Sequence, residues 1–111
     1  MSKNRSRKEN MNTLLQHLED WEQSQQKLLK RESIVLEISD DFEHELGSRY
    51  IEININGLEA KATLWEDGFL ELIAMDEKSK VLIINSSCSV QESYELDEHL
   101  NAWLSELVYY E

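Results

Sequence analysis

The chain has 111 residues, enough for one domain with a modest hydrophobic core, and 41% of them are hydrophobic. Acidic residues number 23 against 11 basic ones, so the formal net charge is -12. This charge repels nucleic acid and anionic membrane surfaces, and we expect neither as a partner.

The cysteine content and the hydropathy pattern indicate a compartment. Cys88 is the only cysteine, so no disulfide can form within the chain, which fits a reducing environment. No apolar run approaches the ~18 residues that would cross a bilayer. The basic residues at the N-terminus are not followed by the apolar segment of a secretory signal. We therefore expect a cytoplasmic protein.

The first ten residues differ in charge from the rest of the chain. They carry four Lys and Arg residues against Glu9 alone, a net charge of +3, which leaves -15 for the other 101 residues. Because this segment has nothing to bury, we predict a disordered basic tail over residues 1–10. Residues 11–111 are predicted to form a single α+β domain.

Residues 11–31 have the periodicity of an amphipathic helix. Basic residues gather in its last turn, where they complement the carbonyl end of the helix dipole. An apolar stripe at helical spacing is formed by Met11, Leu14, Leu18, Trp21 and Leu28, with Leu15 and Leu29 beside it.

The next segments read as strands. A strand is predicted over residues 33–39, followed by an acidic loop over residues 40–48 and a cleanly alternating strand over residues 50–55. Asn56-Gly57 predicts a two-residue type I′ turn, because both residues tolerate positive φ. This turn sets the register, with these pairs expected: Ile55 with Leu58, Ile53 with Ala60, Ile51 with Ala62, and Glu52 with Lys61.

A second hairpin follows, and its turn length is chosen by the hydrophobic pattern. A three-residue loop over residues 66–68, with Gly68 in the left-handed conformation, keeps one face of both strands apolar. The expected pairs are Leu64 with Leu70, Ala62 with Leu72, and Ala60 with Ala74. A turn over residues 76–79 then leads to a fifth strand over residues 80–85.

The C-terminal segment is predicted to be a helix over residues 92–109, capped by Ser89 with Glu92 or by Ser93 alone. Its apolar stripe consists of Leu96, Leu100, Trp103, Leu104 and Leu107. The fold class is therefore α+β, with an N-terminal helix, a five-stranded, mainly antiparallel meander and a C-terminal helix.

The candidates for chemistry do not assemble into a catalytic motif. Acidic residues surround His44 and could offer oxygen ligands to a divalent cation, but the spacing is not that of a calcium loop, and a solvated loop is favoured. Cys88 has no base at a recognisable spacing, and three glycines cannot form a glycine-rich phosphate loop. We expect no catalytic residues, no metal and no cofactor, and hence no enzyme.

One face of the predicted sheet has two interpretations. If the alanines of the hairpins face the core, then Trp65, Phe69 and Ile73 point the other way. An exposed apolar patch of this kind is typical of a partner site, with Trp as an anchor. Alternatively, one helix covers each face of the sheet. The sequence leaves both arrangements open.

Part of the second hairpin resembles a known family. The stretch Thr63-Leu64-Trp65-Glu66-Asp67-Gly68 is similar to the aliphatic-Trp-acid-x-Gly turn of the TriTu family, which consists of immunity proteins encoded beside polymorphic or contact-dependent toxins of bacteria. The resemblance extends over about residues 14–107, including the leading helix with Trp21. The chain departs from the family in its basic residues 1–10 and in its acidic segment 40–48.

The resemblance implies that the protein neutralises a cognate toxin by binding it, often a basic nuclease in such systems. Carboxylates on the inhibitor would steer the encounter and occupy sites meant for phosphates. The expected partner-binding residues are Asp40, Asp41, Glu43, Glu45, Trp65, Glu66, Asp67 and Glu71. The alternative is a non-catalytic adaptor or regulatory module, dimeric through an apolar sheet face; the sequence does not fix the oligomeric state.

Overall fold

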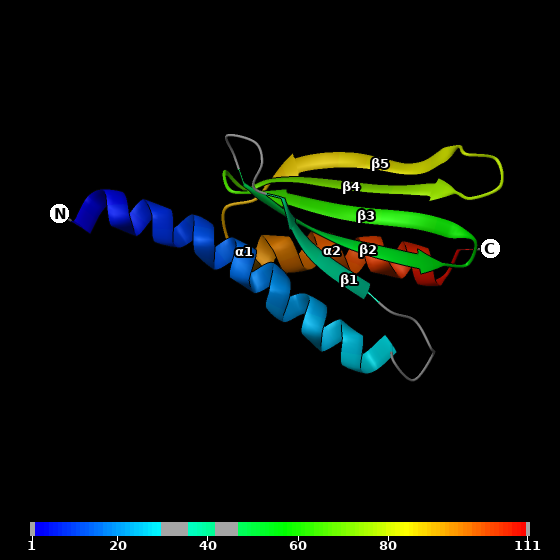
Figure 1. Ribbon diagram of the computed structural model, residues 1–111, viewed down its shortest axis with the longest axis horizontal. Coiled ribbons are helices and arrows are strands. Elements are labelled where there is room, and N and C mark those ends of the chain that lie inside the picture. The colour runs from blue at the N-terminus through cyan, green and yellow to red at the C-terminus, as the bar shows by residue number, and fades with distance from the viewer. Residues whose placement is uncertain (1, 30–35, 42–46, 111) are drawn as a thin grey trace.

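The α+β architecture predicted from the sequence is confirmed. The computed structural model describes residues 2–29, 36–41 and 47–110, with the backbone alone for residues 2–12 and 41. Its five strands form one antiparallel sheet in the order β1-β2-β3-β4-β5, with a helix at each end of the chain (Figure 1). The elements are α1 (Ser2–Leu29), β1 (Leu36–Asp41), β2 (Ser48–Ile55), β3 (Leu58–Trp65), β4 (Phe69–Asp76), β5 (Leu82–Ser89) and α2 (Ser93–Val108).

The hairpin between β2 and β3 has the predicted turn and the predicted register. Asn56 and Gly57 adopt φ values of 53° and 76°, as a two-residue type I′ turn requires. The Asn56 side-chain Nδ2 also donates hydrogen bonds to the carbonyls of Leu107 at 2.8 Å and Val108 at 3.1 Å. Asn56 thus forms part of the turn and also supplies hydrogen bonds to carbonyl groups at the end of α2.

The hairpin between β3 and β4 has the predicted three-residue turn, and Leu64 lies opposite Leu70. Gly68 adopts a φ of 92°, and its N–H donates to the carbonyl of Trp65 at 2.9 Å. The Gly68 carbonyl in turn accepts a hydrogen bond of 2.8 Å from the N–H of Val90. The turn is therefore hydrogen-bonded to the segment that leads into α2.

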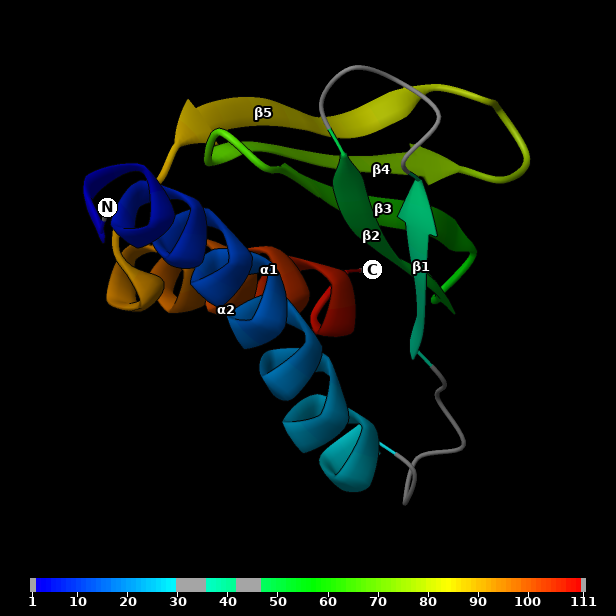
Figure 2. The same cartoon turned by 60° about the vertical axis from the view of Figure 1, so that its left-hand side comes forward.

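Both helices lie on the same side of the sheet (Figures 1 and 2), so a helix does not cover each face. Side chains of both helices form one buried cluster with the apolar face of the strands. On that face Ala60, Ala62 and Ala74 are almost fully buried, and their small side chains let the helices approach closely. The described residues contain no helix that combines the length and hydrophobicity needed to span a membrane.

Polar side chains also connect the two helices. Trp21 of α1 donates its indole N–H to the side-chain oxygen of Asn101 at 2.9 Å, and His17 Nε2 lies 2.8 Å from the Asp97 carboxylate of α2. Trp103 of α2 donates its indole N–H to the carbonyl of Ile73 in β4 at 3.2 Å. The indole N–H groups of both buried tryptophans are thus hydrogen-bonded, and these bonds connect α2 to α1 and to the sheet.

The first helix differs from the prediction in two respects. It begins at Ser2, so residues 2–10, predicted above as a disordered basic tail, are helical in the structure. That segment contains neither Gly nor Pro, and its Lys, Arg and Glu residues are good helix formers, so the packed part of α1 can extend through it. Leu28, placed on the apolar stripe, is 62% exposed, whereas its neighbour Leu29 packs against the core.

Other strand boundaries and the cap of α2 also differ from the prediction. β1 continues through Asp41, so Asp40 and Asp41 are strand residues and do not open a loop. β5 runs from Leu82 to Ser89, four residues beyond its expected end, because ladder pairing to β4 continues through the serine-rich segment. Ser89 thus lies in a strand and Ser93 is the first residue of α2. The N-cap is Glu92, which forms a capping box with Glu95, whose carboxylate accepts from the N–H of Glu92 at 3.0 Å.

Candidate protein-binding surface

The side of the sheet opposite the helices is open, and we call it the outer face. The register shows which residues belong to it. Ile51 and Ile53 of β2 point into the core, so the residues beside them in β2 point outward. The residues paired with those outward residues on adjacent strands also point outward. The outer face consists of Glu37, Ser39, Ser48, Tyr50, Glu52, Asn54, Glu59, Lys61, Thr63, Trp65, Phe69, Glu71, Ile73 and Met75, and it continues onto β5 with Asn85, Ser87 and Ser89.

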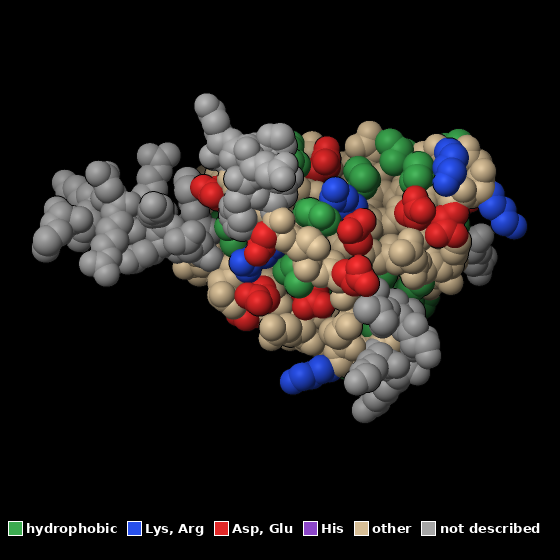
Figure 3. All heavy atoms as spheres, in the orientation of Figure 1, with side chains coloured by type: hydrophobic (Ala, Val, Ile, Leu, Met, Phe, Trp, Pro, Cys, Tyr) green, Lys and Arg blue, Asp and Glu red, His purple; other side chains and the backbone are tan. Residues whose placement is uncertain are grey.

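Carboxylates predominate among the charges of the outer face. It carries four glutamates against the single cation of Lys61, and two of the glutamates, Glu37 and Glu52, lie directly opposite each other on β1 and β2. Figure 3 looks onto this side of the molecule and shows acidic and hydrophobic side chains interspersed over the strands. Like charges held on adjacent strands repel, and a cationic partner would relieve that repulsion.

An aromatic pair lies at one end of the outer face. The turn of residues 66–68 brings the rings of Trp65 and Phe69 to a centroid distance of 5.6 Å with an interplanar angle of 51°. This tilted arrangement is favourable for aromatic rings. Phe69 is 38% exposed and Trp65 is half-buried, so both rings keep surface available for a partner.

Two shallow hollows meet in the middle of the outer face, separated by Lys61 and Ile73. The larger has a volume of about 220 Å³ and is lined by Ser48, Tyr50, Lys61, Thr63, Trp65, Glu71 and Ile73. The smaller, of about 180 Å³, is lined by Glu52, Glu59, Ala60, Lys61, Ile73, Met75 and Leu82. The Lys61 ammonium lies over the Tyr50 ring, 4.2 Å from its centroid, which fixes the lysine between the hollows.

Four of the predicted site residues lie at or near the aromatic pair. Trp65 and Glu71 belong to the outer face. Glu66 instead accepts a hydrogen bond from the N–H of Gly47 at 3.0 Å, and Asp67 accepts one from the N–H of Phe69 at 3.0 Å. The carboxylates of Glu66 and Asp67 therefore stabilise the turn, while Asp67 remains exposed.

The other four predicted residues were expected in one acidic loop. Asp40 lies in β1 and forms an ion pair with Arg49, which also donates to the Leu15 carbonyl of α1 at 3.1 Å. Its charge is thus partly neutralised within the fold. The side chain of Asp41 lies outside the described residues, as do Glu43 and Glu45.

Sequence reasoning missed several members of the outer face. Glu37, Glu52 and Glu59 were not among the expected partner-binding residues, although the alternation of β2 had already placed Glu52 away from the core. Tyr50 and Lys61 were missed as well. The period-two pattern across paired strands would have found them, because the cross-strand partner of an outward residue also points outward.

The described residues offer little for catalysis. No group of three or more His, Cys, Asp or Glu residues within them could hold a metal ion. Burial and the nearby Glu95 carboxylate raise the pKa of the Cys88 thiol, so Cys88 is not an activated nucleophile. A pocket of about 140 Å³ between α1 and the start of α2 is lined by Thr13, Leu14, Gln91, Glu92 and Ser93.

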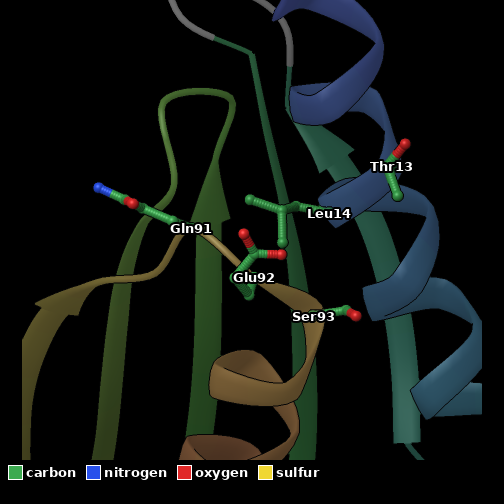
Figure 4. A pocket seen from close by; sticks show the side chains of 5 residues that line it. All are labelled: Thr13, Leu14, Gln91, Glu92 and Ser93. Atoms are coloured by element: carbon green, nitrogen blue, oxygen red, sulfur yellow. The ribbon is translucent and has the colours of Figure 1, made fainter.

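That pocket shows no convergent chemistry. Figure 4 shows the Leu14 side chain directed toward Glu92, while the Gln91 side chain points away from both. The backbone N–H groups of Gln91 and Glu92 both donate to the Glu95 carboxylate at 3.0 Å. These hydrogen bonds lower the pKa of Glu95, and they leave the start of α2 capped from within the chain.

Comparison with protein-family models finds no match over this chain, and comparison with curated proteins finds none either.

Proposed function

We propose that this protein is an immunity protein that binds and neutralises a bacterial toxin bearing a basic surface, and that the outer face is its binding site. The observation that carries the proposal is the composition of that open face, in which four glutamates outnumber the single Lys61 and an aromatic pair lies at one end. The resemblance of the Trp65–Gly68 turn to the TriTu family supports the same function. Binding requires no catalytic residues.

The arrangement suits a cationic protein partner. The glutamates of the outer face would accelerate the encounter with a basic surface, while Trp65 and Phe69 supply apolar area of the kind that anchors interfaces. A toxin that acts on nucleic acid presents cationic side chains where phosphates bind, and carboxylates can occupy those positions. The same glutamates disfavour the adaptor alternative in its face-to-face form, because two copies of the outer face would bring their carboxylates together.

The test uses the toxin encoded beside the gene for this protein as the probe. Titration calorimetry would compare the unaltered chain with a double variant of the outer face, Glu52→Lys with Glu59→Lys. The matched control reverses two exposed charges on the opposite side of the fold, Glu98→Lys with Glu106→Lys on α2. Both variants change the net charge equally and differ only in position.

We expect the outer-face variant to weaken binding at least about tenfold, which corresponds to about 1.4 kcal/mol, and the control to change it far less. Equal weakening by both variants would mean that only long-range charge matters and that the outer face is not the site. Co-expression supplies the functional readout: cells making the toxin should survive only with a binding-competent form. An unaltered chain that neither binds nor protects would refute the proposed function itself.

A further inference from the structure

β5 is a free edge of the sheet. It pairs with β4 on one side, and no strand of the described residues pairs with it on the other. A strand of eight residues at an edge presents a row of backbone N–H and carbonyl groups that another strand can pair with. Such an edge either resists pairing through its side chains or pairs with another strand.

The two edges of the sheet differ in charge. β1, at the opposite edge, contains Glu37, Asp40 and Asp41, and charged edge strands resist pairing with another molecule. β5, with the sequence Leu-Ile-Ile-Asn-Ser-Ser-Cys-Ser, has no charged residue in a chain that is 31% charged. Apolar side chains are exposed at its start, with Val81 57% exposed, Leu82 48% and Ile83 38%.

The charges at the two ends of β5 indicate which kind of strand could pair with it. The turn before the strand carries Lys78 and Lys80, which balance the charges of Asp76 and Glu77. At the other end, Ser89 lies opposite Phe69, two residues beyond Asp67, and the chain continues to Glu92, so that end is acidic. An antiparallel second copy places each acidic end beside the lysine-bearing end of its neighbour. A parallel arrangement would place the two acidic ends together.

We propose that two copies of this chain associate through their β5 strands in antiparallel orientation, joining two five-stranded sheets into one. The strand is uncharged, so this edge brings two acidic bodies together with little local repulsion. A two-fold axis perpendicular to the sheet keeps both outer faces on the same side and leaves them uncovered. The pair would then present two partner-binding surfaces side by side.

The experiment measures the molar mass of the full chain by sedimentation equilibrium over a range of concentrations, with a reductant present to exclude a Cys88 disulfide. The edge variant combines Asn85→Lys with Ser87→Lys, two exposed positions on β5. Its matched control combines Gln23→Lys with Ser105→Lys, two exposed helix positions that add the same charge. Circular dichroism confirms that each variant is folded.

We expect the unaltered chain and the control to shift from one chain of 13.1 kDa to two as the concentration rises, while the edge variant remains monomeric. Lys78→Glu combined with Lys80→Glu should weaken the pair at low salt, because it makes both ends of the strand acidic. A chain that stays monomeric throughout, or a dimer that survives the β5 lysines, would overturn the proposal.

The outer-face variant separates this proposal from the proposed function. Glu52→Lys with Glu59→Lys should weaken toxin binding and leave self-association unchanged, because neither residue lies on β5. Loss of the dimer in that variant, with the dimer kept in the edge variant, would place the contact on the outer face and refute pairing through β5.

Discussion

An added methyl group at Gly68 should destabilise the fold strongly. A Cβ built on Gly68 would lie 2.3 Å from the carbonyl oxygen of Val90 and 3.9 Å from Cδ1 of Leu14. The closest atom belongs to the backbone, so it cannot swing aside as the end of a flexible side chain can. The same segment donates the 2.8 Å hydrogen bond from Val90 N–H to the Gly68 carbonyl, and any shift of Val90 strains that bond.

The expected magnitude follows from three contributions. The left-handed conformation at a φ of 92° costs an alanine about 1–2 kcal/mol. Overpacking against a fixed carbonyl adds about 1–3 kcal/mol, and loss of the hydrogen bond adds about 1 kcal/mol. Gly68→Ala should therefore lower the free energy of unfolding by about 3–6 kcal/mol, a large part of the typical 5–15 kcal/mol of a small domain.

Gly57 provides the matched control. It has a φ of 76°, but a Cβ there would meet no atom within 4 Å, so Gly57→Ala should cost only the conformational term of about 1–2 kcal/mol. Urea denaturation followed by tryptophan fluorescence measures both variants, and the difference between them isolates the contact with Val90. Equal destabilisation of the two variants would show that the turn is not fastened to the start of α2.

Three further substitutions test other contacts. Asn56→Gly keeps the turn but removes both hydrogen bonds to the end of α2, so urea denaturation should show a loss of about 1 kcal/mol. Burial, aided by the Glu19 charge, raises the pKa of Glu22, so the ionised carboxylate destabilises the fold at neutral pH. Glu22→Gln should therefore raise the melting temperature at pH 7, and this gain should vanish below pH 4.5, the ordinary pKa of the carboxyl group. An unchanged melting temperature at pH 7 would contradict this. Arg49→Leu removes the hydrogen bonds that join α1 to β2, so hydrogen exchange in α1 should accelerate while exchange in β3 stays unchanged.

The sequence was sufficient where the structure depends on neighbours along the chain. Both hairpins were predicted with their register, because the turn residues at Asn56-Gly57 and Gly68 act together with the alternation of apolar side chains. The two helices were found by their apolar stripes for the same reason. These features need no knowledge of how distant segments meet.

The remaining features depend on tertiary contacts. Which face the helices cover is decided by packing between distant segments, and the sequence pattern allowed both arrangements. Asp40 was assigned to a solvated loop because it is acidic, yet in the fold it pairs with Arg49, nine residues away along the chain. Glu37 joined the candidate site only when the strand order put it beside Glu52.

Lys61 is the one cation of the outer face, and under the proposed function its charge would repel a basic partner. Its ammonium already lies over the Tyr50 ring, and Glu52 and Ile73 are its cross-strand neighbours. A positive charge held against an aromatic face and beside a carboxylate presents less repulsion to an incoming cation than a free lysine would. Most of the outer face lies on β2, β3 and β4, which are joined by short turns, so few groups would need ordering on binding. On the proposed function, a basic partner would therefore bind without displacing Lys61 from the Tyr50 ring.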